Sequence, residues 1–250
     1  MTSMNGDLNQ EWIDLAPAWI NEARNGPNSN RAGLLDKPML EACGNVQGLR
    51  VLECGCGEGR FCRMLVERGA AYVLGLDLCG PMIDAAKELQ SGRDEYRVAD
   101  VQDLSFLNDG TFDFVVSYMN QNDLPDFRAN NREVARVLKD GGSFIIANLH
   151  PMRSAVGGWQ WTEDGKKQHV ILDRYFDEGE RHWTVRGVQI TNFHRSLATY
   201  VNGFLSDGFA LVGLVEPTVT EEVLVKYPDL VDEMRVPNFI VYILKKMGKK

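Results

Sequence analysis

The sequence lacks a long apolar run, a secretory signal and a basic stripe. No apolar stretch approaches the ~20 residues that a membrane helix needs. The opening residues, MTSMNGDLNQEW, contain neither a basic start nor an apolar stretch, so we expect a cytoplasmic protein without a signal peptide. The formal net charge is −8, whereas nucleic-acid-binding proteins usually carry a basic surface. The composition therefore favours neither a membrane nor a nucleic acid as partner.

Cysteine is also scarce, with five residues in a chain of 250. An odd number in a protein expected in the cytoplasm indicates reduced thiols rather than a disulfide framework. Cys54 and Cys56 flank a glycine in a tight loop, and the four histidines lie far away in the sequence. We therefore expect no metal site.

The order of segments predicts an α/β fold with a largely parallel sheet, because strand-like and helix-like stretches alternate. The length suits a single domain, and 44% apolar residues suffice for a large core. The predicted strands are residues 50–53, 72–77, 96–99, 112–117 and 143–149, followed by an antiparallel pair at 208–215 and 238–245. The predicted helices are residues 8–24 with an interruption at Pro17, then 34–43, 60–68, 81–89, 128–138, 197–205 and 221–235, the last broken at Pro228. Turn residues predict a loop at 25–31 and a turn at 139–142.

Residues 157–193 break this rhythm, because aromatic and polar residues alternate there between turn clusters. We expect two or three antiparallel strands inserted into the α/β domain. Large rings are frequent in the insert and in the N-terminal segment, so the two pieces could form a lid over a binding site. Equally, the rings could form a small core of the insert itself. The predicted division is an N-terminal helical lid (1–44), a binding core (45–151), an inserted β lid (152–195) and the C-terminal part of the core (196–250).

A glycine loop follows the first predicted strand. Glu53 precedes Gly55, Gly57 and Gly59, and a helix begins directly after them. Strand, glycine turn and helix start form a cradle for a nucleotide-like ligand. The dinucleotide fingerprint Gly-x-Gly-x-x-Gly would need its third glycine where Arg60 stands. The carboxylate of Glu53 suits a cationic ligand better than a pyrophosphate, so the loop argues against NAD and against nucleotide phosphates.

Two further acids follow the next strands. Asp77 ends the second strand, where a carboxylate can accept hydrogen bonds from ribose hydroxyls. Asp100 follows the third strand and could accept the amino group of an adenine, with Val101 beside the ring. Three acids at three successive strand ends indicate a cationic adenosine ligand.

Together these segments resemble the class I S-adenosylmethionine-dependent methyltransferases. The resemblance rests on VLECGCGEGRF, GLDLCGPMIDAAKE, RVADVQDLSF, FDFVVSYMNQNDLPD and LKDGGSFIIANLHP, and FHRSLATYVNGFLSDGFALVGLVEP is similar to the C-terminal part of many small-molecule members. It implies a Rossmann-like, seven-stranded, mostly parallel sheet flanked by helices, with S-adenosylmethionine as cofactor. The departure is Glu53, where an aspartate is commoner.

The resemblance also implies roles for individual residues. The glycine loop would bind the methionine part of the cofactor, Asp77 the ribose, and Asp100 with Val101 the adenine. Leu78 and Met82 would flank the adenosine, and residues 117–120 would line the floor near the sulfonium. Trp19 and Arg31 would contact the cofactor from the N-terminal segment.

Methyl transfer requires alignment more than a particular catalytic residue, and a general base is needed only for a hydroxyl or a protonated amine. Our first candidate for a base is His150, at the end of the fifth strand, and the second is His194, at the end of the insert. Tyr118 and Asp123, after the fourth strand, are further candidates. His169 and His182 are expected on the surface. Each histidine could instead have a structural role.

The leading hypothesis is a methyltransferase, monomeric or homodimeric, that acts on oxygen, nitrogen or carbon of a small molecule. A methyltransferase for RNA or protein, a non-catalytic protein that binds S-adenosylmethionine, and a nicotinamide oxidoreductase are the alternatives.

Overall fold

A seven-stranded sheet forms the centre of the protein, whose computed structural model describes residues 2–26 and 28–248. The strand order is β10-β11-β5-β4-β1-β2-β3. The strands are β1 (Arg50–Cys54), β2 (Tyr72–Asp77), β3 (Asp94–Val98), β4 (Phe112–Tyr118), β5 (Leu138–Leu149), β10 (Phe209–Val215) and β11 (Phe239–Lys246). β1 to β5 pair in parallel, whereas β11 is antiparallel to both β5 and β10. The Rossmann-like sheet and its antiparallel C-terminal pair are thereby confirmed.

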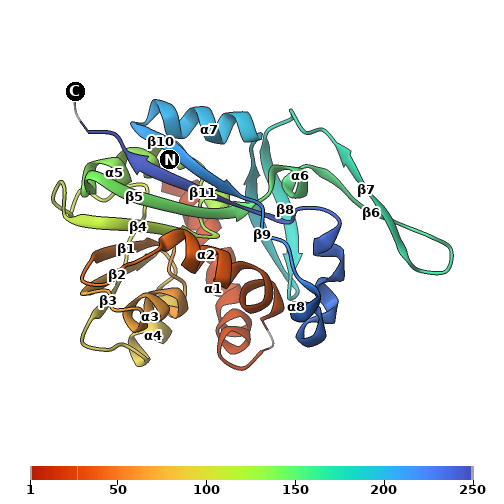
Figure 1. Cartoon of the computed structure of the whole chain (residues 1–250), viewed down its shortest axis with the longest axis horizontal. Helices are drawn as coiled ribbons and strands as arrows, with labels where there is room; N and C mark the ends of the chain where they lie inside the picture. The colour runs from red at the N-terminus through yellow and green to blue at the C-terminus, as the bar shows by residue number, and fades with distance from the viewer. Residues whose placement is uncertain (1, 27, 249–250) are drawn as a thin grey trace.

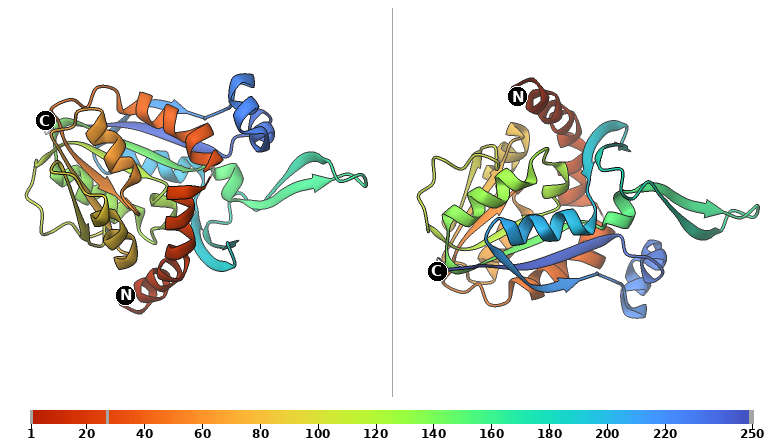
Figure 2. Two further views of the ribbon diagram at one scale, coloured as in Figure 1. Left: turned by 90° about the horizontal axis from the view of Figure 1, so that it is seen from below. Right: turned by 90° about the horizontal axis from the view of Figure 1, so that it is seen from above.

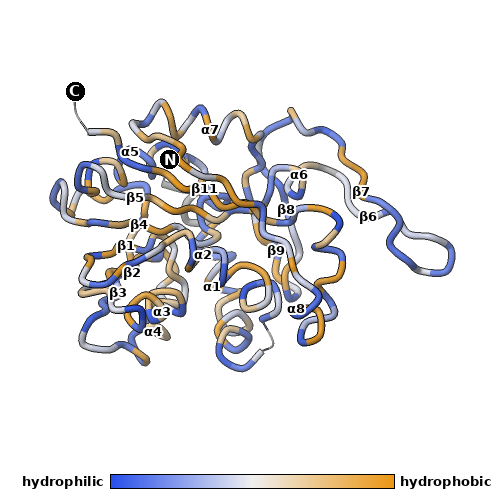
Figure 3. Tube along the Cα trace, in the orientation of Figure 1, coloured by the Kyte–Doolittle hydropathy of each residue, from blue (hydrophilic) through white to orange (hydrophobic). Residues whose placement is uncertain are grey.

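Helices cover both faces of this sheet (Figure 1 and Figure 2). Three of them pack into the apolar cluster on one face: α2 (Asp36–Cys43), α3 (Arg60–Glu67) and α4 (Gly80–Glu88). Two pack into the cluster on the other face: α5 (Phe127–Val137) and α7 (Leu197–Ser206). Because both faces are covered, the strands are apolar on both sides, and β1 is buried at every residue after its first. Figure 3 shows this apolar colouring along the central strands.

The order of strands creates a crevice at one edge of the sheet. Chain order reverses between β1 and β4, which are hydrogen-bonded neighbours. Helices leave β1 and β4 toward opposite faces, so their carboxyl ends separate there, which is where open α/β sheets bind ligands. The glycine loop follows β1, and the turn η2 (Gln121–Asp123) follows β4.

The N-terminal segment forms one long helix, α1 (Thr2–Asn25), that continues through Pro17. The expected interruption is therefore wrong. Proline removes one helical hydrogen bond, but Leu15 and Ala16 are fully buried, and packing of an apolar face can offset that loss. A π-helical turn, η1 (Ser29–Leu35), replaces much of the loop expected at 25–31, within which Pro27 lies outside the described residues.

The insert contains four strands in two hairpins, more than the two or three expected. It begins after α6 (Pro151–Ser154); β6 (Val156–Trp161) pairs with β7 (Lys167–Asp173), and β8 (Gly179–Val185) pairs with β9 (Val188–His194). Figures 1 and 2 show the β6–β7 hairpin projecting from the body. Residues 174–178 connect the two hairpins, and each hairpin pairs only within itself.

The boundaries of other helices and strands differ by a few residues from those predicted from the sequence. β3 begins at Asp94 rather than at residue 96, and Asp100 follows it after a short gap. Residues 139–142 belong to the irregular start of β5, where the pairing register shifts opposite Phe112 and Phe114. The break at Pro228 is confirmed, between α8 (Glu221–Lys226) and the 3-10 helix η3 (Pro228–Met234).

None of the helices in the described part of the chain is long and apolar enough to span a membrane.

Candidate functional site

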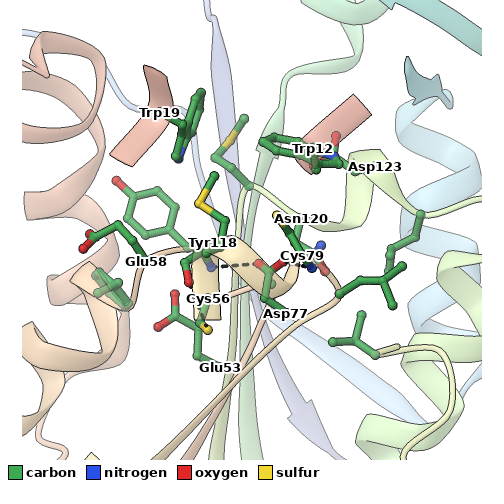
Figure 4. Close-up of a pocket in the computed structure, with 18 of the residues that line it drawn as sticks. Trp12, Trp19, Glu53, Cys56, Glu58, Asp77, Cys79, Tyr118, Asn120 and Asp123 are labelled. Atoms are coloured by element: carbon green, nitrogen blue, oxygen red, sulfur yellow. Dashed lines mark hydrogen bonds between the residues drawn. The ribbon is translucent and has the colours of Figure 1, made fainter. Parts of the chain in front are cut away.

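A cavity of about 270 Å³ opens at the carboxyl ends of β1, β2 and β4. It is the crevice expected from the strand order, and α1 closes it from the other side (Figure 4). Most of the residues singled out from the sequence line it: Glu53, Gly55, Gly57, Asp77, Leu78, Met82, Asp100, Val101, Trp19, Arg31 and Tyr118. Gly59 is not part of the lining and instead caps the N-terminus of α3.

The glycine loop adopts a backbone that favours glycine. Gly55, Gly57 and Gly59 have φ angles of 73°, 53° and 80°, in the left-handed region that other residues rarely adopt. A Cβ on Gly55 would overlap the side chain of Asn120, which follows β4. A Cβ on Gly59 would lie 2.6 Å from the ring of Tyr96. The glycines therefore serve the turn itself and its close approach to β3 and β4, in addition to any ligand.

Glu53 lies at the bottom of the cavity with 2% of its surface exposed. The thiol of Cys62 donates a hydrogen bond to Glu53 Oε2 at 2.8 Å. Burial raises the pKa of Glu53 from 4.5 to about 8, although the Cys62 hydrogen bond and the charge of Arg31 act in the opposite direction. The carboxyl group is therefore mostly protonated at neutral pH until a cation approaches it.

This raised pKa predicts proton release when a cationic ligand binds. A positive charge beside Glu53 stabilises the carboxylate, so the bound state ionises and close to one proton should leave at pH 7. Calorimetry of S-adenosylmethionine binding in buffers of different ionisation enthalpy measures this release. Glu53→Gln should abolish it, whereas Glu67→Gln, exposed on α3, should leave it unchanged. Equal proton release by wild type and Glu53→Gln would contradict the assignment.

The same shift links Glu53 to the stability of the unliganded protein. Its pKa in the folded state lies above the ordinary value of 4.5, so between about pH 4.5 and 8 the folded protein binds the extra proton. Glu53 thus contributes stability that is complete below about pH 4.5 and is lost as the pH rises through about 8.

Asp77 connects the glycine loop to the start of α4. Its Oδ2 accepts a hydrogen bond from Gly57 N at 2.8 Å, and its Oδ1 accepts one from Cys79 N at 2.9 Å. Burial raises the pKa of Asp77, and these backbone donors oppose the rise. Each carboxylate oxygen has further lone pairs, so Asp77 can accept hydrogen bonds from a ligand without releasing the loop.

Asp100 and Val101 form the far wall of the cavity. Asp100 Oδ1 accepts a hydrogen bond from Gln102 N at 2.8 Å, which fixes the turn after β3. Asn130 Nδ2 on α5 donates to the carbonyl of the buried Val101 at 2.9 Å. The pair therefore combines a carboxylate with an apolar wall, as an adenine ring requires.

Arg31 and Trp19 contact each other at the α1 side of the cavity. The Arg31 guanidinium carbon lies 4.9 Å from the Trp19 ring centre and 5.2 Å from that of Tyr118. The guanidinium of Arg31 makes no ion pair or hydrogen bond with any residue that the structure describes, and its backbone N–H donates to the carbonyl of Asn28 at 3.0 Å. A guanidinium lining a cavity without an anionic partner is suited to bind a carboxylate of a ligand.

Polar contacts hold α1 against the second hairpin of the insert. Glu11 accepts hydrogen bonds from Thr191 N at 2.8 Å and from Thr191 Oγ1 at 2.9 Å. Glu22 forms an ion pair with Arg186 in the tight turn between β8 and β9. Trp12 and Trp19 on α1 meet edge to face, with ring centres 5.7 Å apart. The sequence predicted that the two pieces meet, but it did not identify Glu11, Thr191 and Arg186. Glu11 and Thr191, for example, are 180 residues apart in the sequence.

The geometry points away from His150 and His194 as bases, since neither lines the cavity. His150 Nδ1 accepts a hydrogen bond from Met152 N at 3.1 Å, and its Nε2 lies 3.0 Å from Glu216 Oε1. His194 is fully buried, with hydrogen bonds at 2.8 Å to Ser154 Oγ and at 2.9 Å to the carbonyl of Tyr175. His150 thus fixes the turn after β5 and joins it to Glu216, whereas His194 joins α6 to the connection between the two hairpins. Each ring therefore has a structural role, as the sequence also allowed.

Tyr118 lines the cavity but faces a carboxylate. Its hydroxyl donates a hydrogen bond to Asp36 Oδ1 at 2.9 Å, and Arg60 forms an ion pair with the same Asp36. Burial and the charge of Asp36 raise the pKa of Tyr118 well above its usual value. Because this raised pKa keeps the phenol protonated at neutral pH, it cannot take up a further proton. Tyr118 is therefore better suited to shape the cavity wall.

Comparison with known proteins gives consistent similarities. Residues 52–146 match the model of a family described as a methyltransferase domain. A solved S-adenosylmethionine-dependent methyltransferase from Mesorhizobium loti is 32% identical, with a TM-score of 0.75, over 84% of this chain and 95% of that chain.

Among curated sequences, an uncharacterized protein of Haemophilus influenzae is 29% identical over 76% of this chain and 78% of its own length. A ubiquinone biosynthesis O-methyltransferase of Xanthomonas euvesicatoria is 35% identical over 41% of this chain, and the match spans 44% of that protein.

Proposed function

We propose that this chain, which belongs to the class I S-adenosylmethionine-dependent methyltransferase family, transfers the methyl group to a small-molecule acceptor at oxygen, nitrogen or carbon. The family and its cofactor follow from the similarity to a methyltransferase of known structure over nearly that protein's whole length. The acceptor class is the proposal. The observation that carries it is the closure of the cavity by α1 and β9.

The residues of the cavity fit S-adenosylmethionine group by group. Glu53 would hold the ammonium and Arg31 the carboxylate of its methionine part, because the two side chains have opposite charges and line the same cavity. Asp77 would accept hydrogen bonds from the ribose hydroxyls. Asp100 with Val101 would hold the adenine, and Leu78 and Met82 would flank the adenosine.

When bound, S-adenosylmethionine supplies a methyl group that is electrophilic because its sulfur carries a positive charge. The protein's part is to align the acceptor with that group and to exclude water, and such positioning can contribute ~7–11 kcal/mol. Trp12 and Trp19 would provide apolar surface around the acceptor under α1. Gly55 and Asn120, in contact at the carboxyl ends of β1 and β4, would form the floor below the sulfur.

The covering of the cavity by α1 and β9 favours a small acceptor over RNA or protein. An acceptor must fit beneath α1 and the β8–β9 hairpin, which Glu11 with Thr191 and Glu22 with Arg186 hold together. The net charge of −8 also disfavours an RNA substrate. The likeness of part of the chain to ubiquinone biosynthesis O-methyltransferases supports a small acceptor as well. We further propose a cytoplasmic setting, which the five free and buried cysteines support.

A methyl-transfer screen with isotope-labelled S-adenosylmethionine tests the proposal. The library should contain hydroxyl compounds, amines and carbon nucleophiles as separate groups, with bulk RNA and an unfolded protein as further acceptors. We expect transfer to at least one small molecule, at a rate that changes less than about threefold between 50 and 200 mM salt, because nucleic-acid binding would fall far more steeply. Transfer to RNA or protein alone would contradict the proposal.

A further inference from the structure

Asp123 stands at the part of the cavity that the cofactor contacts proposed above leave unused. It ends η2, the turn that follows β4 after Asn120, and its side chain is only partly buried. Figure 4 shows Asp123 at the Trp12 end of the cavity, with Glu53 at the opposite end. An acceptor seated beneath Trp12 would therefore meet the Asp123 carboxyl group.

The two oxygens of Asp123 have different surroundings. Oδ1 accepts hydrogen bonds from two amides, Asn122 Nδ2 at 2.7 Å and Asn192 Nδ2 on β9. Oδ2 has no hydrogen bond, and Asp123 forms no ion pair, with any residue in the described ranges. One oxygen is thus fixed by the protein while the other remains available at the cavity wall.

The protein holds this turn firmly. Arg195, next to the end of β9 and buried, donates to the carbonyls of Leu124 at 2.6 Å and Pro125 at 2.9 Å. Its guanidinium carbon lies 4.8 Å from the ring centre of Phe127. On the other side, Gln121 Nε2 donates to Asn131 Oδ1 on α5 at 2.8 Å. Asp123 is therefore positioned by β9 and α5 rather than left on a free loop.

Resting on the proposed function, we propose that Asp123 is the catalytic base of this enzyme, and that the acceptor presents a hydroxyl or a protonated amine to its Oδ2. The acceptor's oxygen or nitrogen gives its proton to Asp123 Oδ2. The electron pair left on that atom forms the new bond to the methyl carbon, and the pair of the broken carbon–sulfur bond remains on sulfur, which becomes a neutral thioether. The proton afterwards passes to water.

The charges around Asp123 suit this role. Burial raises the pKa of Asp123 well above its usual value, and the charge of Asp77 on β2 adds to the rise. The hydrogen bonds from Asn122 and Asn192 and the charge of Arg31 on η1 oppose it. A carboxylate with a raised pKa accepts a proton more readily than an ordinary one.

A purely structural link between η2 and β9 explains this arrangement less well. An asparagine at position 123 could join Asn192 by an amide–amide hydrogen bond without a buried charge. A carboxylate without a cationic partner costs stability when it is desolvated. Such groups concentrate at functional sites.

The test compares Asp123→Asn with Asp126→Asn, a matched change in the same loop. Asp126 is exposed and caps α5 by accepting a hydrogen bond from Ala129 N at 3.0 Å, which asparagine can also do. With an acceptor from the screen, we expect Asp123→Asn to lower kcat at least about 100-fold while the Kd of S-adenosylmethionine stays within about threefold. Asp126→Asn should retain both values.

Asn192→Leu examines the positioning role of Asn192. Because the Asn192 hydrogen bond lowers the pKa of Asp123, its loss should move the acid limb of kcat/KM to higher pH. Carbon-13 NMR of the aspartate carboxyls supplies a readout that needs no turnover. With S-adenosylhomocysteine bound, the resonance absent from Asp123→Asn should titrate above the usual range of an aspartate, and higher still in Asn192→Leu.

The possible results distinguish a failure of this inference from a failure of the proposed function on which it rests. Three outcomes would overturn the inference and leave the proposed function intact. They are a kcat of Asp123→Asn within threefold of the wild-type kcat, methylation at carbon alone, and a carboxyl of Asp123 that titrates in the usual range. Binding of S-adenosylmethionine without transfer to any small molecule would contradict the proposed function and, with it, the inference.

Discussion

Asp77→Ala should weaken the binding of S-adenosylmethionine at least about 100-fold, because hydrogen bonds to a charged group contribute about 1.5–3 kcal/mol each and two would be lost with the ribose. The same change also removes the acceptors of Gly57 N and Cys79 N, which shape the glycine loop. Isothermal titration calorimetry measures the loss directly. The lost ribose contacts and the disturbed glycine loop both weaken binding. Asp77→Ala should therefore lower the affinity more than the loss of any other single cofactor contact.

Two companion variants separate the ribose contact from damage to the loop. Asp77→Asn keeps one carbonyl acceptor and the volume of the side chain, so its affinity should lie between those of wild type and Asp77→Ala. Asp84→Ala, exposed on α4 and outside the cavity lining, is the matched control and should bind normally. Unchanged affinity in Asp77→Ala would remove the ribose contact from the proposed site.

Gly55→Ala should also weaken cofactor binding, for a steric reason. The new Cβ would overlap the side chain of Asn120, and the backbone at Gly55 has a φ of 73°. The loop and the turn after β4 would have to separate, which distorts the floor of the cavity. We expect affinity to fall at least about tenfold and the free energy of unfolding to drop by about 1–3 kcal/mol.

Gly44→Ala provides a close control for this substitution. Gly44 has a similar φ of 62°, is exposed, and has nothing within 4 Å of the position that a Cβ would occupy. It should therefore show a backbone cost alone, of about 1–3 kcal/mol because its ψ of −139° lies outside the left-handed helical region, with normal cofactor affinity. Thermal unfolding and calorimetry on the two variants distinguish the clash from the backbone strain. Equal behaviour of Gly55→Ala and Gly44→Ala would show that the contact with Asn120 is unimportant.

The residues proposed to bind the cofactor could be predicted from the sequence because their patterns lie within short stretches of the chain. Glu53, Gly55, Gly57 and Asp77 all occur at strand ends or in the turns after them, where residue type and spacing directly reflect backbone geometry. Parallel pairing then brings these ends to one edge of the sheet, so the grouping of residues 53, 77 and 100 followed from the order of strands alone. The continuous helix through Pro17 was misjudged because packing of Leu15 and Ala16 outweighed a local rule.

The end of the cavity near Trp12 depends on contacts between distant parts of the chain. Histidine at a strand end predicted His150 and His194 as bases, yet side-chain direction at a strand end depends on what packs against it, and both rings are bonded within the protein. Asn192 reaches Asp123 only because β9 folds back over η2, and Glu11 meets Thr191 only because α1 crosses the second hairpin. No local spacing encodes such pairs. The sequence by itself therefore determined the sheet and the methyl donor, whereas the tertiary structure alone decided which side chains line the rest of the cavity.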